Sequence, residues 1–236
     1  MSARLRVGLA VVISGIAAAS LIRAQTFLTD ILLTGEPWAI DVNRLTGRVY
    51  VSNRLGPVTV IDEATLSVVG TIDIGPNQGG GSSIAVNWAT NRIYWAEQFG
   101  PVVVADGNTN ATIATLPARH NEGLAVNSVT NRIYVGDFFA LVVVDGMTHN
   151  VVATVPLDTA TGRVAVNDLT NMVYVGSQSS AVIWVIDGAT NNLVARIEPG
   201  ARYVAVSPST NRIYTSGGYA GFQIMALHRS ECTVSG

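Results

Sequence analysis

One phrase of nine residues occurs five times in this chain, and its spacing limits the possible folds more than any other feature. Each copy begins with asparagine, or serine in the last copy, has a Thr-Gly or Thr-Asn turn at its centre, and carries a tyrosine at its eighth position. The copies span residues 43–51, 87–95, 127–135, 167–175 and 207–215, so their tyrosines stand at the nearly evenly spaced positions 50, 94, 134, 174 and 214. A strand-like repeat with a period of about 40 residues is typical of a β-propeller or a similar repeat array.

Each repeat contains four short segments with the composition of β-strands. In the third repeat these segments are 124–127, 132–136, 141–145 and 150–155, and they are rich in β-branched and aromatic residues. Tight turns separate them, of which Asp145-Gly146 is a strong hairpin signal. Four such strands make one antiparallel blade, whose two apolar faces have to be covered by neighbouring blades.

The number of strands predicts how the array ends. The last repeat supplies only three strands, near 204–207, 212–215 and 222–227, whereas segment 27–34 has the composition and position of a spare fourth strand. We therefore predict an all-β fold, with a single β-propeller domain over residues 25–236. It would have five blades of four antiparallel strands and be closed by pairing of the N-terminal strand with the last blade. An open arc, or a closed dimer of two arcs, is the alternative.

The polar residues that recur in every repeat are interpreted as structural. The central turns end in a residue that tolerates a left-handed backbone, and the tyrosines are expected to pack between blades. Asp41 is an exception, because it stands where the other repeats have alanine and needs a hydrogen-bond donor if it is buried. The aspartates that close the third strands are expected to form turns rather than bind metal, and the arginines of the phrase to form a solvated rim. These residues are Asp62, Asp106, Asp145 and Asp187, and Arg48, Arg92, Arg132 and Arg212.

Residues 1–24 have the pattern of an export signal rather than of the repeat. Arg4 and Arg6 precede an apolar run over residues 7–22, and the small residue Ala24 precedes Gln25 at a suitable cleavage position. The run of about 16 residues is shorter than the roughly 20 that a membrane-spanning helix needs, although an uncleaved anchor is the alternative. We expect a signal peptide over 1–24, an extracytoplasmic location (periplasmic, secreted or at the cell surface) and no transmembrane helix after its removal.

Charge and cysteine content narrow the range of partners. The 14 basic residues are all arginine, against 16 acidic residues, and loss of residues 1–24 would bring the net charge to about −5. The sequence has no basic stripe, so we expect no nucleic-acid partner. Cys232 is the only cysteine and cannot form an internal disulfide. We expect a monomer whose stability comes from packing.

Four residues carry a resemblance to a known family. Tyr50-Val51-Ser52-Asn53 differs by one residue from the Tyr-Val-Thr-Asn signature of the YVTN β-propeller repeats. The chain also resembles that family in its asparagine-turn phrase and in the Asp-Gly-x-Thr turns at 106–109, 145–148 and 187–190, and the likeness covers about residues 27–227. The resemblance implies a propeller of a kind that is often exported or at the cell surface. Related propellers include lactone hydrolases and quinone- or haem-linked dehydrogenase subunits.

The resemblance implies no catalytic residue, because the repeat motif is structural. The other four repeats depart from the signature, since Glu97, Asp137, Ser177 and Gly217 replace its asparagine.

Propeller topology separates the regular turns from the loops that differ between blades, and places the two sets on opposite faces. The irregular face is the candidate binding surface, with its richest sector between the second and third repeats. Phe138 and Phe139 favour binding, because two adjacent phenylalanines on a loop are costly to expose. The alternative is that these loops are polar because they are wet, with Arg119 paired locally to Glu122. The candidate ligand-binding residues are Glu97, Phe99, Arg119, His120, Glu122, Asp137, Phe138 and Phe139.

These observations favour an exported binding or interaction module with an unknown ligand or protein partner. The sequence contains no phosphate loop, haem-attachment motif, nucleophile elbow or zinc-protease helix, so an enzyme is not the favoured interpretation and no catalytic residue is assigned. The alternative is a metal-assisted, lactonase-like hydrolase at the channel mouth. In that alternative Glu97, Asp137 and His120 would surround a divalent metal; no other cofactor is expected.

Overall fold

The computed structural model describes residues 3–8, 27–54, 56–75, 81–97, 100–119, 122–217 and 225–228, and these residues form strands and turns without a helix. The strands make five consecutive antiparallel sheets, which we call blades 1 to 5, and a separate two-stranded sheet. Each blade uses the strands of one repeat in chain order, from the inside of the array outward. The predicted all-β fold and its blades are thus confirmed.

The strand boundaries follow the sequence repeats closely. Blade 1 contains β3 (Pro37–Asn43), β4 (Arg48–Asn53), β5 (Val58–Asp62) and β6 (Ser67–Ile72). Blade 2 contains β7 (Gly81–Asn87), β8 (Arg92–Glu97), β9 (Pro101–Asp106) and β10 (Thr112–Arg119), and blade 3 contains β11 (Leu124–Asn127), β12 (Arg132–Asp137), β13 (Ala140–Asp145) and β14 (Val151–Pro156). Blade 4 contains β15 (Thr161–Asn167), β16 (Met172–Ser177), β17 (Ile183–Asp187) and β18 (Asn192–Ile197), and blade 5 contains β19 (Tyr203–Ser207), β20 (Arg212–Ser216) and β21 (Met225–His228).

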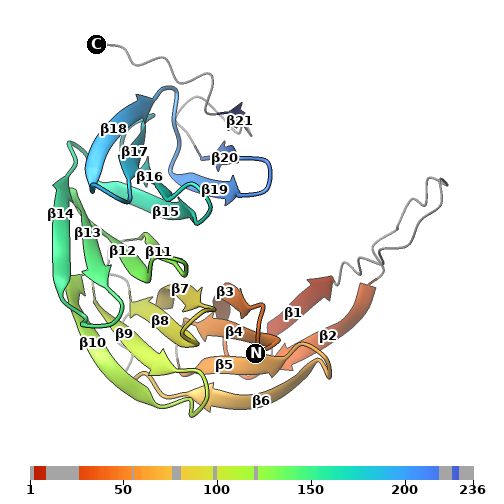
Figure 1. Ribbon diagram of the computed structural model, residues 1–236. Helices are drawn as coiled ribbons and strands as arrows, with labels where there is room; N and C mark the ends of the chain where they lie inside the picture. The colour runs from red at the N-terminus through yellow and green to blue at the C-terminus, as the bar shows by residue number, and fades with distance from the viewer. Residues whose placement is uncertain are drawn as a thin grey trace, which may run out of the picture.

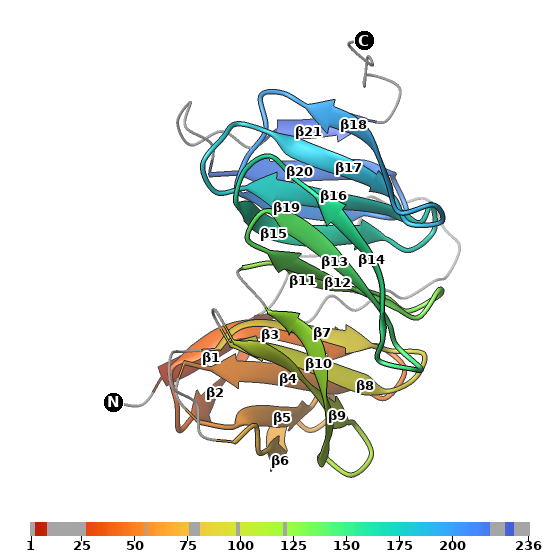
Figure 2. The ribbon, with the colours of Figure 1, turned by 90° about the vertical axis from the view of Figure 1, so that its left-hand side faces the viewer.

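The five blades follow one another around a C-shaped arc (Figure 1). A view from the side shows blades 1 and 2 at one end, blades 4 and 5 at the other and blade 3 between them (Figure 2). Neighbouring blades touch through their innermost strands, so that β3 lies beside β7, β7 beside β11, β11 beside β15 and β15 beside β19.

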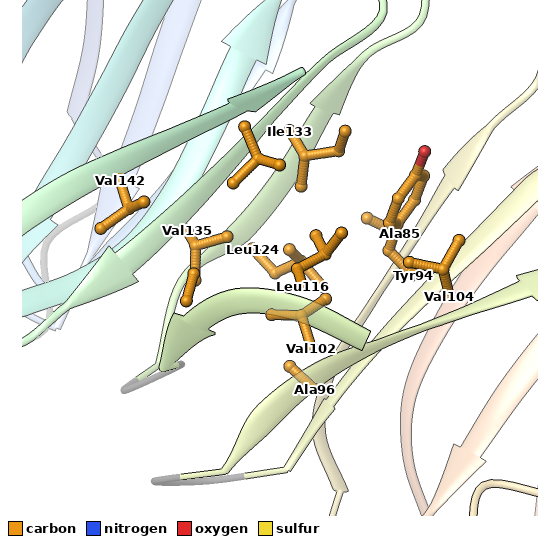
Figure 3. Packing of buried hydrophobic residues seen from close by; sticks show 12 residues of the cluster. Ala85, Tyr94, Ala96, Val102, Val104, Leu116, Leu124, Ile133, Val135 and Val142 are labelled. Atoms are coloured by element: carbon orange, nitrogen blue, oxygen red, sulfur yellow. The ribbon is translucent and has the colours of Figure 1, made fainter. Parts of the chain in front are cut away.

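The core consists of the layers between adjacent blades. Figure 3 shows one such layer, in which Tyr94, Val102 and Leu116 of blade 2 meet Leu124 and Ile133 of blade 3. As predicted, the tyrosines of the first four repeats are packed in these layers, with exposed fractions of 0%, 0%, 0% and 6%. Burial raises the pKa of Tyr94 and of Tyr134 to about 12, so both side chains stay neutral and act as packing groups.

A side-chain hydrogen bond between asparagines joins each blade to the next. The asparagine that begins the phrase donates from Nδ2 to Oδ1 of the turn asparagine of the following blade, and the N···O distances are 2.7–2.9 Å. Its own Oδ1 accepts from two backbone N–H groups of its turn, as Asn127 does from Val129 and Thr130. The turn asparagines have φ of 50–54°, which confirms the expected left-handed backbone. The four bridges are Asn43–Asn91, Asn87–Asn131, Asn127–Asn171 and Asn167–Asn211.

The two ends of the arc lack the matching halves of this bridge. Ser207 takes the donor position in blade 5, and Gly47 takes the acceptor position in blade 1. The bridge therefore spans the four junctions between consecutive blades, whereas the residues at the two ends could not form a fifth amide–amide bond.

Within the ranges that the structure describes, the expected closure by the N-terminal strand is not present. Strand β2 (Phe27–Leu33) pairs with β1 (Ala3–Gly8), and β21 pairs only with β20 among the described residues. The prediction overlooked β1, because it treated the segment before Gln25 only as a leader. The described chain has the open arc that the sequence left as the alternative.

The arginine rim is also different from the expectation. Arg48, Arg92 and Arg132 are partly buried and form ion pairs with Asp62, Asp106 and Asp145 of the adjacent strand, so they are not simply solvated. The aspartates are turn formers, as predicted. Hydrogen bonds from the backbone N–H groups of Thr148 and Met147 are the main reason that the pKa of Asp145 falls to about 2.

Asp41 lies at the junction of blades 1 and 2, where its carboxylate meets the neighbouring strand β7. One carboxylate oxygen accepts a hydrogen bond from the backbone N–H of Val42 at 2.8 Å, and the other from that of Val86 on β7 at 2.7 Å. Burial raises the pKa of this carboxyl group, although the two hydrogen bonds oppose the rise.

Replacing Asn127 by alanine should reduce the free energy of unfolding by about 2 kcal/mol, because the change removes a buried bridge and the cap of a turn. The matched control is Ser207→Ala, the same position in blade 5, where no bridge exists; we expect a change below about 0.5 kcal/mol. Urea denaturation measures both. Equal losses of unfolding free energy in the two variants would show that the hydrogen bond between blades adds no stability beyond that of the turn cap.

The raised pKa of Asp41 predicts a specific dependence on pH. The unfolded carboxyl group ionises at a lower pH than the folded one, so stability is lost as pH rises from about 4 through the raised folded-state pKa. In Asp41→Ala this loss should be absent, and the difference in stability between wild type and variant should change across that interval. Urea midpoints between pH 3.5 and 7 test this. A difference that is constant with pH would contradict the assignment.

Candidate functional site

The loops of the irregular face converge through contacts between blades that are not neighbours. Glu122, in the loop from blade 2 to blade 3, forms a bidentate ion pair with Arg202, in the loop from blade 4 to blade 5. Arg163 of β15 donates to Ser83 Oγ of β7 at 2.9 Å and to the backbone oxygen of Glu122 at 3.3 Å. We call Ser83, Glu122, Arg163 and Arg202 the central cluster. Because its members come from innermost strands and crossing loops, it links the blades across the inside of the arc.

Glu122 is held firmly in this cluster. The residue is 8% exposed, its carboxylate receives the Nε–H of Arg202 at 2.8 Å as well as a second guanidinium N–H, and its backbone oxygen receives the hydroxyl of Ser83 at 3.0 Å. Charge-assisted bidentate contacts are strong and directional. Glu122 therefore fixes the loops against one another. The expected local pair with Arg119 is wrong, since the partner comes from two blades away.

The sequence contains a signal for this contact that our interpretation missed. Glu122 and Arg202 occupy equivalent positions in their repeats, three residues before Ala125 and Ala205. Gly162 occupies the same position in the repeat of blade 4. A side chain at Gly162 would collide with the backbone oxygen of Arg202, 2.5 Å from the position of its Cβ. The pattern that predicts the ion pair is therefore a pair of opposite charges at this position in blades 3 and 5, with glycine at the same position in blade 4.

Phe138 and Phe139 form the turn between β12, which ends at Asp137, and β13. Phe138 has a φ of +39° and is 42% exposed, and Phe139 is 61% exposed. The backbone oxygen of Phe138 accepts from the N–H of Thr161, and that of Phe139 from the N–H of Leu157, both at 2.7 Å. The turn is thereby attached to the crossing loop from blade 3 to blade 4. The backbone that carries the two rings is therefore fixed by a hydrogen bond at each of the two residues.

The crossing loop is itself anchored on blade 4. Asp158 accepts hydrogen bonds from the indole Nε1 of Trp184 at 3.1 Å and from the guanidinium of Arg196 at 2.8 Å. Trp184 is buried, so the loop is tied to the core of blade 4. This anchoring lowers the conformational entropy that the phenylalanine turn would lose on binding.

Charge beside the turn is mixed. Partial burial raises the pKa of Asp137, and the positive charge of Arg119 opposes the rise. The structure thus places an acidic and a basic side chain near an exposed apolar turn. Glu97 ends β8, at the register in blade 2 that Asp137 has in blade 3. Phe99 and His120 lie outside the described residues.

The described residues line at least two hollows. One, of about 280 Å³, lies on blade 5 and is mainly apolar; it is lined by Arg163, Tyr203, Val204, Ala205, Tyr214, Thr215 and Ser216. The other, of about 320 Å³, is polar and lies between the outer parts of blades 1 and 2; its lining includes Thr46, Arg48, Asn91 and Asn108.

The described residues contain no group of three or more His, Cys, Asp or Glu side chains placed to hold a metal ion. His120, a member of the metal site considered from the sequence, is not among them. No helix long and apolar enough to cross a membrane is found in the described part of the chain.

Comparison with known proteins supports the fold and leaves the family open. No family model matches the sequence, and no curated protein matches it. Among solved structures 1531 chains match, so the fold is widespread and its likeness alone does not select a function. One is a WD40-type β-propeller in the crystal structure of a mitotic checkpoint complex, with a TM-score of 0.74 and 17% sequence identity. The match covers 87% of this chain but only 64% of that one. This chain is therefore similar in fold to a β-propeller that extends well beyond the matched part.

Proposed function

We propose that this protein is an exported binding module that holds a protein partner or ligand on its irregular face, with the Phe138–Phe139 turn at the centre of the contact. The observation that carries the proposal is the exposure of two adjacent aromatic rings on a turn whose backbone is hydrogen-bonded to the crossing loop. Aromatic anchors on a rigid support are typical of the residues that dominate binding energy in protein interfaces.

The surroundings of the turn fit the same interpretation. Asp137 and Arg119 supply charges of both signs beside the apolar rings, as in interfaces where a polar rim encloses an apolar centre. Two partly exposed rings on one turn also offer apolar area that a partner could bury.

The opposite face offers less to a partner. Its ion pairs and turn hydrogen bonds recur in several blades with nearly the same geometry, and Arg48, Arg92 and Arg132 are paired with aspartates of the adjacent strand. Its exposed apolar side chains include Leu45 at 66% and Leu169 at 72%, one in each of two turns. A single exposed apolar residue in a turn is ordinary on a protein surface.

The export part of the proposal rests on the N-terminal sequence pattern, with cleavage after Ala24. We expect mass spectrometry of the protein from the extracytoplasmic fraction to give a mature chain that begins at Gln25. Recovery of chains that retain Met1 from the cytosol, and none outside it, would contradict export.

Replacing both Phe138 and Phe139 by alanine should weaken partner binding at least about tenfold, because each ring would bury apolar surface worth roughly 25 cal/mol per Å². The readout is quantitative capture of proteins from the extracytoplasmic fraction on immobilised wild type and variant, followed by dissociation constants for the partners recovered. Melting temperatures of the two proteins should agree within a few degrees, since both rings lie outside the core.

The matched control is the double variant Leu45→Ala and Leu169→Ala, which removes comparably exposed apolar side chains from the other face. Its capture profile should equal that of wild type. If the leucine variant loses partners and the phenylalanine variant keeps them all, the binding face is the regular one.

A further inference from the structure

In every complete blade, the fourth strand covers part of the next blade. Ile72 of β6 packs in one cluster with Trp95 and Val103 of blade 2, and Leu116 of β10 packs with Ile133 of blade 3. The same arrangement recurs farther on, where Val155 of β14 joins the cluster of blade 4 and Ile197 of β18 joins that of blade 5. A fourth strand therefore belongs to two blades, pairing with one and packing on the other.

Strand β2 packs on blade 1 as such a fourth strand would. Ile31 and Leu33 of β2 are 6% and 3% exposed, and they form a cluster with Val49, Val51 and Ile61 of blade 1. β2 also ends shortly before β3, just as β10, β14 and β18 end shortly before the first strand of the next blade. By packing and by position in the chain, β2 is the outer strand of a blade that would precede blade 1.

The strands that would complete that blade are at the other end of the chain. Among the described residues blade 5 has three strands, β19, β20 and β21, and no fourth. The place beside β2 is taken by β1, which pairs with it antiparallel from Ala3↔Leu33 to Gly8↔Phe27. Figure 1 shows β1 on the side of β2 nearer the centre of the arc, where a third strand lies in each complete blade.

The two end faces of the arc expose residues that other junctions bury. Tyr214 and Tyr203 of blade 5 are 37% and 42% exposed, and Ile40 and Val42 of blade 1 are 50% and 43% exposed. At the junction of blades 1 and 2, Tyr50 packs with Ile84 and Val86. These two residues occupy the positions in blade 2 that Ile40 and Val42 have in blade 1. Tyr214 occupies the position in blade 5 that Tyr50 has in blade 1. The two end faces therefore carry the apolar residues of one further blade–blade junction, Tyr214 on one face and Ile40 and Val42 on the other.

We propose that β1 occupies the edge of β2 that belongs to β21, so that the N-terminal segment holds the arc open. Once this segment is removed, β21 of the same chain pairs with β2 and completes blade 5 from both ends of the chain. In the cell this rests on the proposed cleavage after Ala24, which would remove β1 and leave β2 intact. The missing asparagine bridge between Ser207 and Gly47 makes this junction weaker than the other four, and hence the one that opens.

Hydrogen exchange on the purified protein tests the proposal without depending on export. Three proteins are compared with the full-length chain: one lacking residues 1–24, one carrying Leu5→Pro and one carrying Leu5→Ala. Proline removes a backbone donor and disrupts the pairing of Leu5 with Ile31, whereas alanine keeps both. Exchange of the amides in residues 225–228 should slow at least about tenfold in the truncated and proline proteins, and stay unchanged in the alanine protein.

Disulfide trapping identifies the strand that pairs with β21. In a Cys232→Ser background, Leu32→Cys is combined in turn with a cysteine at each of positions 225–228, in the full-length and the truncated chain. We expect an intramolecular disulfide in at least one truncated protein and in none of the full-length ones. Disulfide-linked dimers, or unprotected amides at 225–228 in both the truncated and the proline protein, would overturn the proposal.

The two proposals can fail separately. If protein from the cell retains Met1 but the purified truncated chain closes, the export proposal falls and the role of β1 stands. If the chain is cleaved in the cell and the truncated protein stays open, the export proposal stands and the proposed role of β1 falls.

Discussion

The blades of this protein are apolar on both faces, and each of these faces needs a neighbouring sheet to cover it. Residues of one blade such as Tyr94, Val102 and Leu116 are buried because Leu124 and Ile133 of the next blade lie against them. Apolar burial of this kind is the main source of stability in folded domains. No blade has a core of its own, so the array depends on contacts between nearest neighbours.

This dependence explains why the fold was predictable. The even spacing of the phrase, the alternation of strand and turn residues and the repeated tyrosine all reflect the same layer between blades, so they identify the blades and their strands from sequence alone. The left-handed turn residues and the turn-forming aspartates also behaved as predicted, because their geometry is local. The arginines of the rim did not, because their ion pairs reach to the adjacent strand and depend on side-chain direction as well as on spacing.

The candidate site was predictable in part. The exposure of Phe138 and Phe139 follows from a two-residue turn, which is a local feature. The partner of Glu122 was missed because Arg202 is 80 residues away, and their contact depends on the curvature of the arc. The pairing of β2 was missed for a related reason. Local composition identifies a strand but does not decide which of two available edges it joins, and the residues before it were interpreted only as a leader.

The asparagine bridge gives the array a direction. In each bridge the donor belongs to the earlier blade and the acceptor to the later one, so every internal repeat carries both halves and fits on either side of any other. A gene encoding such repeats can gain or lose a whole unit by unequal recombination, and the new neighbours will still match. Gly47 and Ser207 mark the two repeats that carry only one half. Duplication should therefore be tolerated best in the interior, and the number of blades is the property of this architecture most open to evolutionary change.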